Sequence, residues 1–125
     1  MTHAENASVE ARAVATIEGQ PNLGTFFVKP LLRGERLALL EIRAEAGTAS
    51  AVHAHPHESL LYVVSGRLAT TIADESFVLG PGDACRHPKD APHLVRAIED
   101  TVFVEIKSPP PDLRATFGLE GGAAR

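Results

Sequence analysis

The sequence contains a single cysteine, Cys85, among 125 residues. One cysteine excludes a disulfide within the chain and a zinc site built from several thiolates of one chain. No segment approaches the roughly 18–20 apolar residues that a membrane-spanning helix needs. The first ten residues, MTHAENASVE, also lack the apolar centre of a signal peptide. From these absences we expect a soluble, cytoplasmic protein.

Basic charge is scarce as well. The chain has 12 lysines and arginines against 16 acidic residues, a net charge of −4, and no cluster of basic residues. A chain of this kind has no general attraction for phosphate backbones or anionic lipids. We therefore expect neither nucleic acid nor a membrane as a partner. The length and the 44% hydrophobic content favour one folded domain with a real core.

Most of the chain consists of short apolar or β-branched segments separated by turn signals such as GPGD at 80–83. Strands are predicted at 11–17, 25–32 (interrupted by Pro30), the second half of 35–47, 60–64, 67–72, 76–79, 93–98 and 101–106. No convincing long helix accompanies them. The pattern favours an all-β sandwich or barrel with little helix.

The chain ends are read differently. Residues 1–10 are polar and predict a flexible arm, so that the barrel domain spans 11–108. Residues 109–125 predict a C-terminal tail, or a lid over the barrel mouth. In that lid DLRATF would make one helical turn, and Arg114 or Phe117 would touch a ligand. The final GLEGGAAR is expected to fray.

Three histidines lie at alternate positions in the run HAHPH. On a strand, His53 and His55 would point to the same face and supply half of a metal site. His57 has the same parity but follows a proline. Taken alone, the residues leave open a metal site or ordinary surface and core histidines.

The spacing around these histidines resembles the two sequence motifs of the cupin superfamily. The matching residues are Gly47, His53, His55 and Gly66 for the first motif, and Gly82, Pro88 and His93 for the second. The resemblance, to a small single-domain cupin, covers roughly residues 35–107. It implies a double-stranded β-helix (jelly-roll) barrel. It also carries the metal-ligand role onto His53, His55 and His93, which would hold one divalent transition-metal ion.

The chain departs from the family pattern at the fourth ligand. The position that is usually glutamate in the first motif is Ser59 here. Three neutral imidazoles would leave the ion its full +2 charge, which favours an anionic, chelating substrate, and the ligand set fits Fe, Mn, Ni, Cu or Zn. His57, Glu58 and Ser59 remain open as a fourth ligand or as neighbours of the ion. The second motif has Asp90 in place of glycine, a residue that tolerates positive φ.

The residues that follow Gly82 of the second motif form a candidate strand in the wall of the pocket. Cys85 and His87 share one of its faces, Arg86 occupies the other, and the residues do not tell which face is inward. An inward His87 would approach the metal as a base. An inward Arg86 would offer a cation to a substrate carboxylate.

The predicted function is a metal-dependent enzyme for a small, oxygen-rich, anionic molecule, because three-histidine cupins include dioxygenases. A sugar-acid or small-molecule isomerase or lyase is one alternative, since the HPHE run resembles a run that recurs in cupins associated with sugar-acid chemistry. A non-catalytic ligand-binding cupin and a barrel whose metal site has decayed are the others. A homodimer is expected, because a small barrel has sheet edges that need cover and residues 11–32 supply apolar strand.

Overall fold

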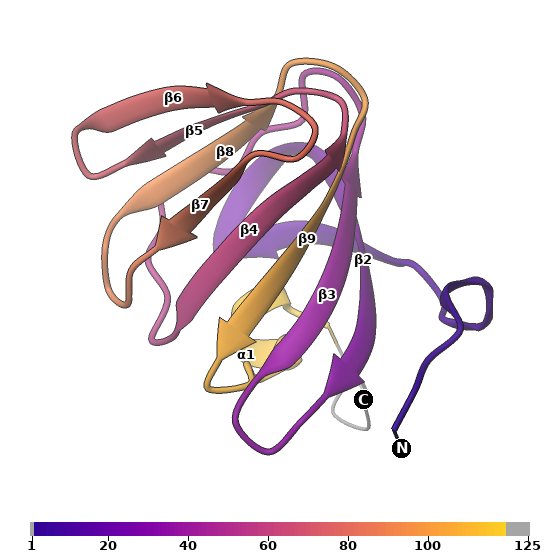
Figure 1. Cartoon of the computed structure of the whole chain (residues 1–125). Helices are drawn as coiled ribbons and strands as arrows, with labels where there is room; N and C mark the ends of the chain where they lie inside the picture. Colours follow the sequence, from indigo (N-terminus) through magenta and orange to yellow (C-terminus); the bar gives the residue numbers. More distant parts are fainter. Residues whose placement is uncertain (1, 120–125) are drawn as a thin grey trace.

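The computed structural model describes residues 2–119, so most of the predicted frayed end lies outside the described residues. Nine strands make up almost all of the regular structure (Figure 1). Their bounds are β1 Arg12–Ile17, β2 Gln20–Arg33, β3 Ala38–Ala44, β4 Glu58–Ser65, β5 Leu68–Ile72, β6 Glu75–Leu79, β7 Ala84–His87, β8 His93–Ala97 and β9 Thr101–Ser108. A 3₁₀ turn, η1 (Asn6–Ser8), precedes them, and a short helix, α1 (Leu113–Phe117), follows them.

The strands form two antiparallel sheets that face each other. The larger sheet has the order β1-β2-β3-β9-β4-β7, and the smaller has the order β6-β5-β8. The segment that precedes β4 joins the two sheets: Ser50 N–H donates to the carbonyl of Val95 on β8 (2.9 Å). Apolar side chains from both sheets fill the space between them. This arrangement confirms the predicted all-β jelly-roll barrel.

The predicted break at Pro30 is an irregularity within one long strand. Pro30 pairs with Leu40 of β3, and the register then shifts before Leu32. Proline has no N–H for the ladder, and a one-residue bulge lets the pairing resume beyond it. The strand prediction at 25–32 therefore located β2 but began it too late and ended it too early, since β2 spans Gln20–Arg33.

Glycine and aspartate take the backbone conformations that the turns require. At Gly66, φ is +87°, and a Cβ atom there would lie 2.3 Å from the carbonyl oxygen of Asp100. Asp90 has φ of +62°, as expected from its place in the second motif. Its N–H donates to the carbonyl of His55 (2.9 Å), which ties the two histidine segments together.

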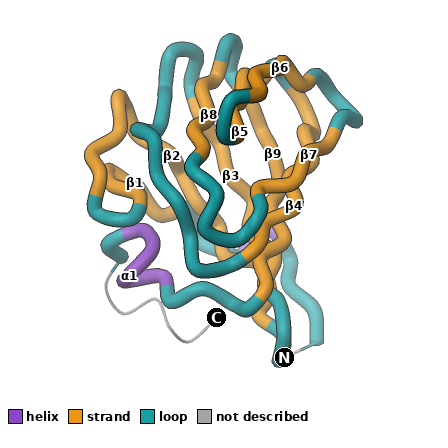
Figure 2. The backbone as a smooth tube through the Cα atoms, turned by 90° about the vertical axis from the view of Figure 1, so that its left-hand side faces the viewer, coloured by secondary structure: helices purple, strands orange, loops and turns teal. Residues whose placement is uncertain are grey.

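Helix α1 lies at the β1 end of the barrel (Figure 2). The Asp112 side chain caps its first turn, and Leu113 and Phe117 are buried in the core. The predicted helical turn is therefore present, and Phe117 packs inward. Among residues 2–119, no helix is long and apolar enough to cross a membrane.

Residues near the N-terminus lie against the outside of the larger sheet. The side-chain amide of Asn6 donates to the Glu41 carboxylate on β3, and Lys29 on β2 donates to the Asn6 carbonyl (3.0 Å). Val9 is buried. These contacts fix the entry of the chain into β1.

Candidate metal centre

Three histidines from two segments converge inside the barrel. His53 and His93 lie directly opposite each other and exchange two backbone hydrogen bonds, of 3.0 and 2.8 Å. His55 follows two residues later on the same face. One ring nitrogen from each of the three histidines lies within 4.8 Å of the other two, and all three residues are buried.

Each of the three imidazoles is fixed through its Nδ1 atom. Nδ1 of His53 lies 2.7 Å from the Ala51 carbonyl oxygen, and Nδ1 of His93 lies 3.0 Å from the Ala91 carbonyl oxygen. A carbonyl can only accept, so Nδ1 carries the hydrogen in both rings. Nε2 is left with its lone pair, which is the form that binds a metal ion.

His55 is fixed by a carboxylate. Its Nδ1 lies 2.7 Å from Oε2 of Glu18, in the turn between β1 and β2. Burial lowers the pKa of His55 far below its usual value, with the charge of Lys107 adding to the effect. The ring is therefore neutral and donates a hydrogen bond to Glu18. Burial also raises the pKa of Glu18, and Lys107 opposes that shift.

Sequence reasoning missed Glu18. The Glu18-Gly19 pair between two strands is a turn signal, but nothing in the sequence shows that this turn folds over the histidines. The structure supplies the reason: Glu18 N–H donates to the Thr116 carbonyl in α1 (2.7 Å). The C-terminal helix thus holds the turn in place.

The other two converging histidines are neutral as well. Burial lowers the pKa of His53 and of His93 to about 4, in part because these rings and their neighbours repel one another's charge. A neutral imidazole is required for metal binding, since a protonated one has no free lone pair. The protein therefore holds these three ligand atoms ready at neutral pH.

Ser59 lies on the inner face of β4 and is fully buried. It accepts a hydrogen bond from Nζ of Lys107 on β9 (2.9 Å). The same ammonium lies 3.3 Å from Oε2 of Glu105, which is also buried. A lysine and a glutamate thus lie inside the barrel beside the position where the family usually has its acidic ligand.

Glu105 and Lys107 were not predicted. On β9 the residues of one parity, Val102, Val104 and Ile106, are all apolar, so a hydrophobicity argument makes them the buried face. The structure instead turns them outward, and Ile106 is 40% exposed. The opposite, mixed face lines the interior. The signal available in the sequence was a strand with one entirely apolar face and with Glu105 and Lys107 together on the other face.

His57 and Glu58 occupy different environments. His57 is buried and stacks on His55, with ring centroids 4.4 Å apart. Its Nε2 has no hydrogen-bond partner among the residues that the structure describes, and it is not one of the three converging rings. Glu58 points outward and pairs with Arg86 (3.0 Å). The structure therefore does not bring Glu58 to the histidines.

Strand β7 turns Cys85 and His87 inward and Arg86 outward. His87 pairs with Ser59 across the sheet, stacks on His93 with centroids 4.0 Å apart, and its Nε2 lies 3.1 Å from Oγ1 of Thr70. Burial raises the pKa of the Cys85 thiol to about 12, with the charge of Glu105 adding to it. Cys85 is therefore a neutral thiol at physiological pH.

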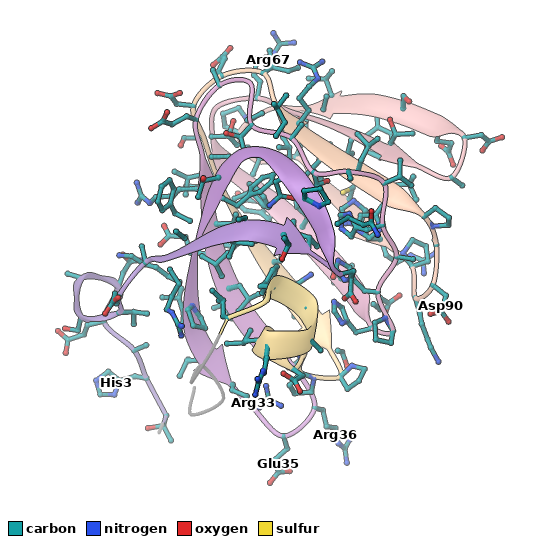
Figure 3. All side chains as sticks on the ribbon, turned by 180° about the vertical axis from the view of Figure 1, so that it is seen from behind. His3, Arg33, Glu35, Arg36, Arg67 and Asp90 are labelled. Carbon is teal, nitrogen blue, oxygen red and sulfur yellow. The ribbon has the colours of Figure 1, made fainter. Side chains whose placement is uncertain are left out.

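The histidines line a small cavity in the barrel interior. Its polar wall consists of the three converging rings with His87, Glu105 and Lys107, and the rest is apolar and includes Phe117. Figure 3 shows the contrast with the outside, where labelled charged side chains such as Glu35, Arg36 and Arg67 point away from the barrel. The cavity is the one part of the described interior that combines an ion pair with converging ligand atoms.

Comparison with known proteins identifies a family and relatives for this chain. Residues 40–106 match the family model described as "Cupin domain". Oxalate decarboxylase OxdC from Bacillus subtilis (strain 168) is 32% identical over 78 residues, which is 58% of this chain and 20% of that protein. The chain thus spans about a fifth of that relative's length.

Solved structures agree on the fold. The structure of KdgF from Halomonas sp. has a TM-score of 0.78 at 23% identity, covering 89% of this chain and 97% of that one. An RmlC-like cupin from Shewanella frigidimarina NCIMB 400 has a TM-score of 0.77 at 21% identity, covering 87% and 91%. The family and the three-histidine cluster together indicate a site for a divalent metal ion. With more than half of its length matched by the family model, the chain belongs to the cupin family.

Proposed function

We propose that this protein is a divalent-metal-dependent enzyme that acts on a small, oxygen-rich, anionic molecule. The observation that carries the proposal is the fixing of three neutral imidazoles through Nδ1, which leaves three Nε2 lone pairs within reach of one point. A metal ion bound there would act as a Lewis acid toward an oxygen atom of the substrate.

The charge of the cavity supports an anionic substrate. The three proposed ligands are neutral, so they leave the charge of the ion uncompensated. The Lys107–Glu105 pair adds one positive and one negative charge. Because Ser59 stands in place of a carboxylate, the polar wall of the cavity is positive overall once an ion is bound.

A dioxygenase-like reaction is the form of the proposal that we favour. Three protein ligands leave coordination positions for a bidentate substrate and for O₂. His87 stacks on His93, is hydrogen-bonded to Thr70 and lines the same cavity, so it would be available as a neutral base. The apolar walls would exclude water from the reacting molecule.

A lyase or isomerase on the same site is the second candidate, and a specific observation favours it. Glu105 is a buried carboxylate in the cavity wall. Together with the limited similarity to an oxalate decarboxylase, it suggests acid–base chemistry that needs no added oxygen. A binding protein without catalysis would use the same cavity.

Metal analysis followed by substrate screening tests the proposal. Purified protein is expected to hold one Fe, Mn, Ni, Cu or Zn ion per chain. O₂ uptake with diketones, thiols or phenolics would support the dioxygenase, and turnover of a small acid without O₂ uptake would support the lyase. Protein that binds none of these ions when they are supplied would refute both.

A further inference from the structure

Three polar side chains form a row across the inner face of the larger sheet. His87 on β7 pairs with Ser59 on β4, and Ser59 pairs with Lys107 on β9. Lys107 is 1% exposed, and its side chain lines the same cavity as His53, His55, His87 and His93. The ammonium group is therefore part of the polar wall that contains the three converging histidines.

A buried ion pair such as Lys107–Glu105 is not a general requirement of a barrel interior. Replacing a buried ion pair by well-packed apolar side chains of similar volume is often neutral or stabilising. Phe103, two residues before Glu105 on the same inner face, shows that this part of β9 accepts a large apolar side chain. Charges kept in an interior at such a cost are typical of ligand sites.

The hydrogen-bond capacity of Lys107 is only partly used. An ammonium group has three N–H donors. Within residues 2–119 its acceptors are Ser59 Oγ (2.9 Å) and Glu105 Oε2 (3.3 Å). Lys107 also lines the cavity that contains the three histidines. One donor is thus left for a molecule in that cavity, while Ser59 and Glu105 hold the ammonium in place.

We propose that Lys107 binds a carboxylate of the substrate. The substrate class is a small acid with a second oxygen donor next to its carboxylate, such as a dicarboxylate, an α-keto acid or an α-hydroxy acid. One end of such a molecule reaches the ammonium while its oxygen donors face the three imidazoles. Glu105 limits the negative charge that the cavity accepts. This inference rests on the proposed metal-dependent function and names the substrate class of that site.

Oxalate is the simplest probe, because it is the smallest acid with two adjacent carboxylates. Zinc-loaded protein is titrated with oxalate by calorimetry, and the zinc content is measured in the same samples. Lys107→Met is expected to weaken oxalate binding roughly 10- to 100-fold, the size of one lost hydrogen bond to a charged group. Lys89→Met removes an exposed lysine from the loop after β7 and is expected to change nothing.

Glu105→Gln supplies a test of opposite sign. It keeps the shape of the side chain and removes a negative charge, so oxalate is expected to bind at least as tightly as in the unmodified protein. Structural damage to the cavity would instead weaken binding in both variants. Should Lys107→Met alone fail to fold, the double variant Lys107→Met with Glu105→Leu leaves no unpaired charge, and weakened oxalate binding is expected in it too.

The outcomes separate this inference from the function on which it rests. Unmodified protein that binds none of Fe, Mn, Ni, Cu or Zn overturns the proposed function and this inference with it. Zinc retained by a folded Lys107 variant that binds oxalate as tightly as the unmodified protein overturns the role of Lys107 alone. Zinc-loaded protein that does not bind oxalate overturns the substrate class. Glu105→Gln binding oxalate as weakly as Lys107→Met overturns the direct role of Lys107.

Discussion

Acidification should unfold the metal-free protein well above the pH at which carboxylates titrate. Five histidines remain neutral in the folded barrel because burial lowers their pKa, to about 4 for His53, His57, His87 and His93 and further for His55. In the unfolded chain a histidine has a pKa of about 6.5. Between these two values the unfolded state binds protons that the folded state does not, so the free energy of unfolding falls as the pH falls.

The expected effect is large. Each such histidine contributes up to about 1.4 kcal/mol per pH unit within this window, and five contribute roughly 7 kcal/mol per pH unit. A typical domain has a total stability of about 5–15 kcal/mol, so a decrease of roughly one to two pH units below about 6.5 would exhaust it. The lowered pKa of Glu105 acts in the same direction, whereas the raised pKa of Glu18 opposes it.

Urea unfolding of chelator-treated protein, followed by circular dichroism at several pH values from about 7 to 4.5, measures this slope. His87→Asn should reduce it by about a fifth, because one of five buried histidines is removed. His3→Asn is the matched control, since His3 is exposed near the N-terminus and should leave the slope unchanged. A midpoint that stays constant over this range would refute the argument that buried neutral histidines dominate the acid response.

Three further outcomes follow from the site and from the fold. Glu18→Gln should lower zinc affinity about 10- to 100-fold, because the Nδ1–H of His55 loses its carboxylate acceptor, whereas Glu58→Gln on the outer face should not; equal affinities in a competition titration would contradict this. Ser59→Glu should strengthen metal retention, because the new carboxylate would stand at the position of the family's usual fourth ligand. It should also weaken oxalate binding, because that carboxylate would lie beside Lys107. A variant unchanged in both properties would show that position 59 does not act on the ion. We also propose a homodimer, for which light scattering should give about twice the 13.3 kDa chain mass at all but the lowest concentrations; a monomer across a wide range would contradict it.

The fold could be predicted from the sequence because its signals are local. Alternating strands, turn residues and the spacing from Gly47 to His93 do not depend on distant contacts. The same is true of Asp90, whose conformation follows from its residue type and position. The open question of which face of β7 points inward needed the structure, since Cys85 with His87 and Arg86 are both acceptable inward faces by sequence.

The polar residues around the histidines were harder to predict from the sequence than the fold. Glu18 lies 37 residues before His55 in the sequence. The two meet because α1 holds the turn that contains Glu18. Glu105 and Lys107 were missed because their strand buries its mixed face and exposes its apolar one. Partners that come from distant elements, and strands that reverse the usual hydrophobic rule, depend on tertiary packing, which a single sequence does not display.

Zinc binding by the unmodified protein and by His93→Ala tests the central claim most directly. Groups that only hydrogen-bond to a metal ligand are worth about 10- to 100-fold in affinity, so loss of a ligand itself should cost more than that. The unmodified protein should bind one zinc ion per chain, and His93→Ala should fail to hold it, while His3→Ala binds normally. Equal zinc affinity in His93→Ala and the unmodified protein would contradict a metal centre built from His53, His55 and His93.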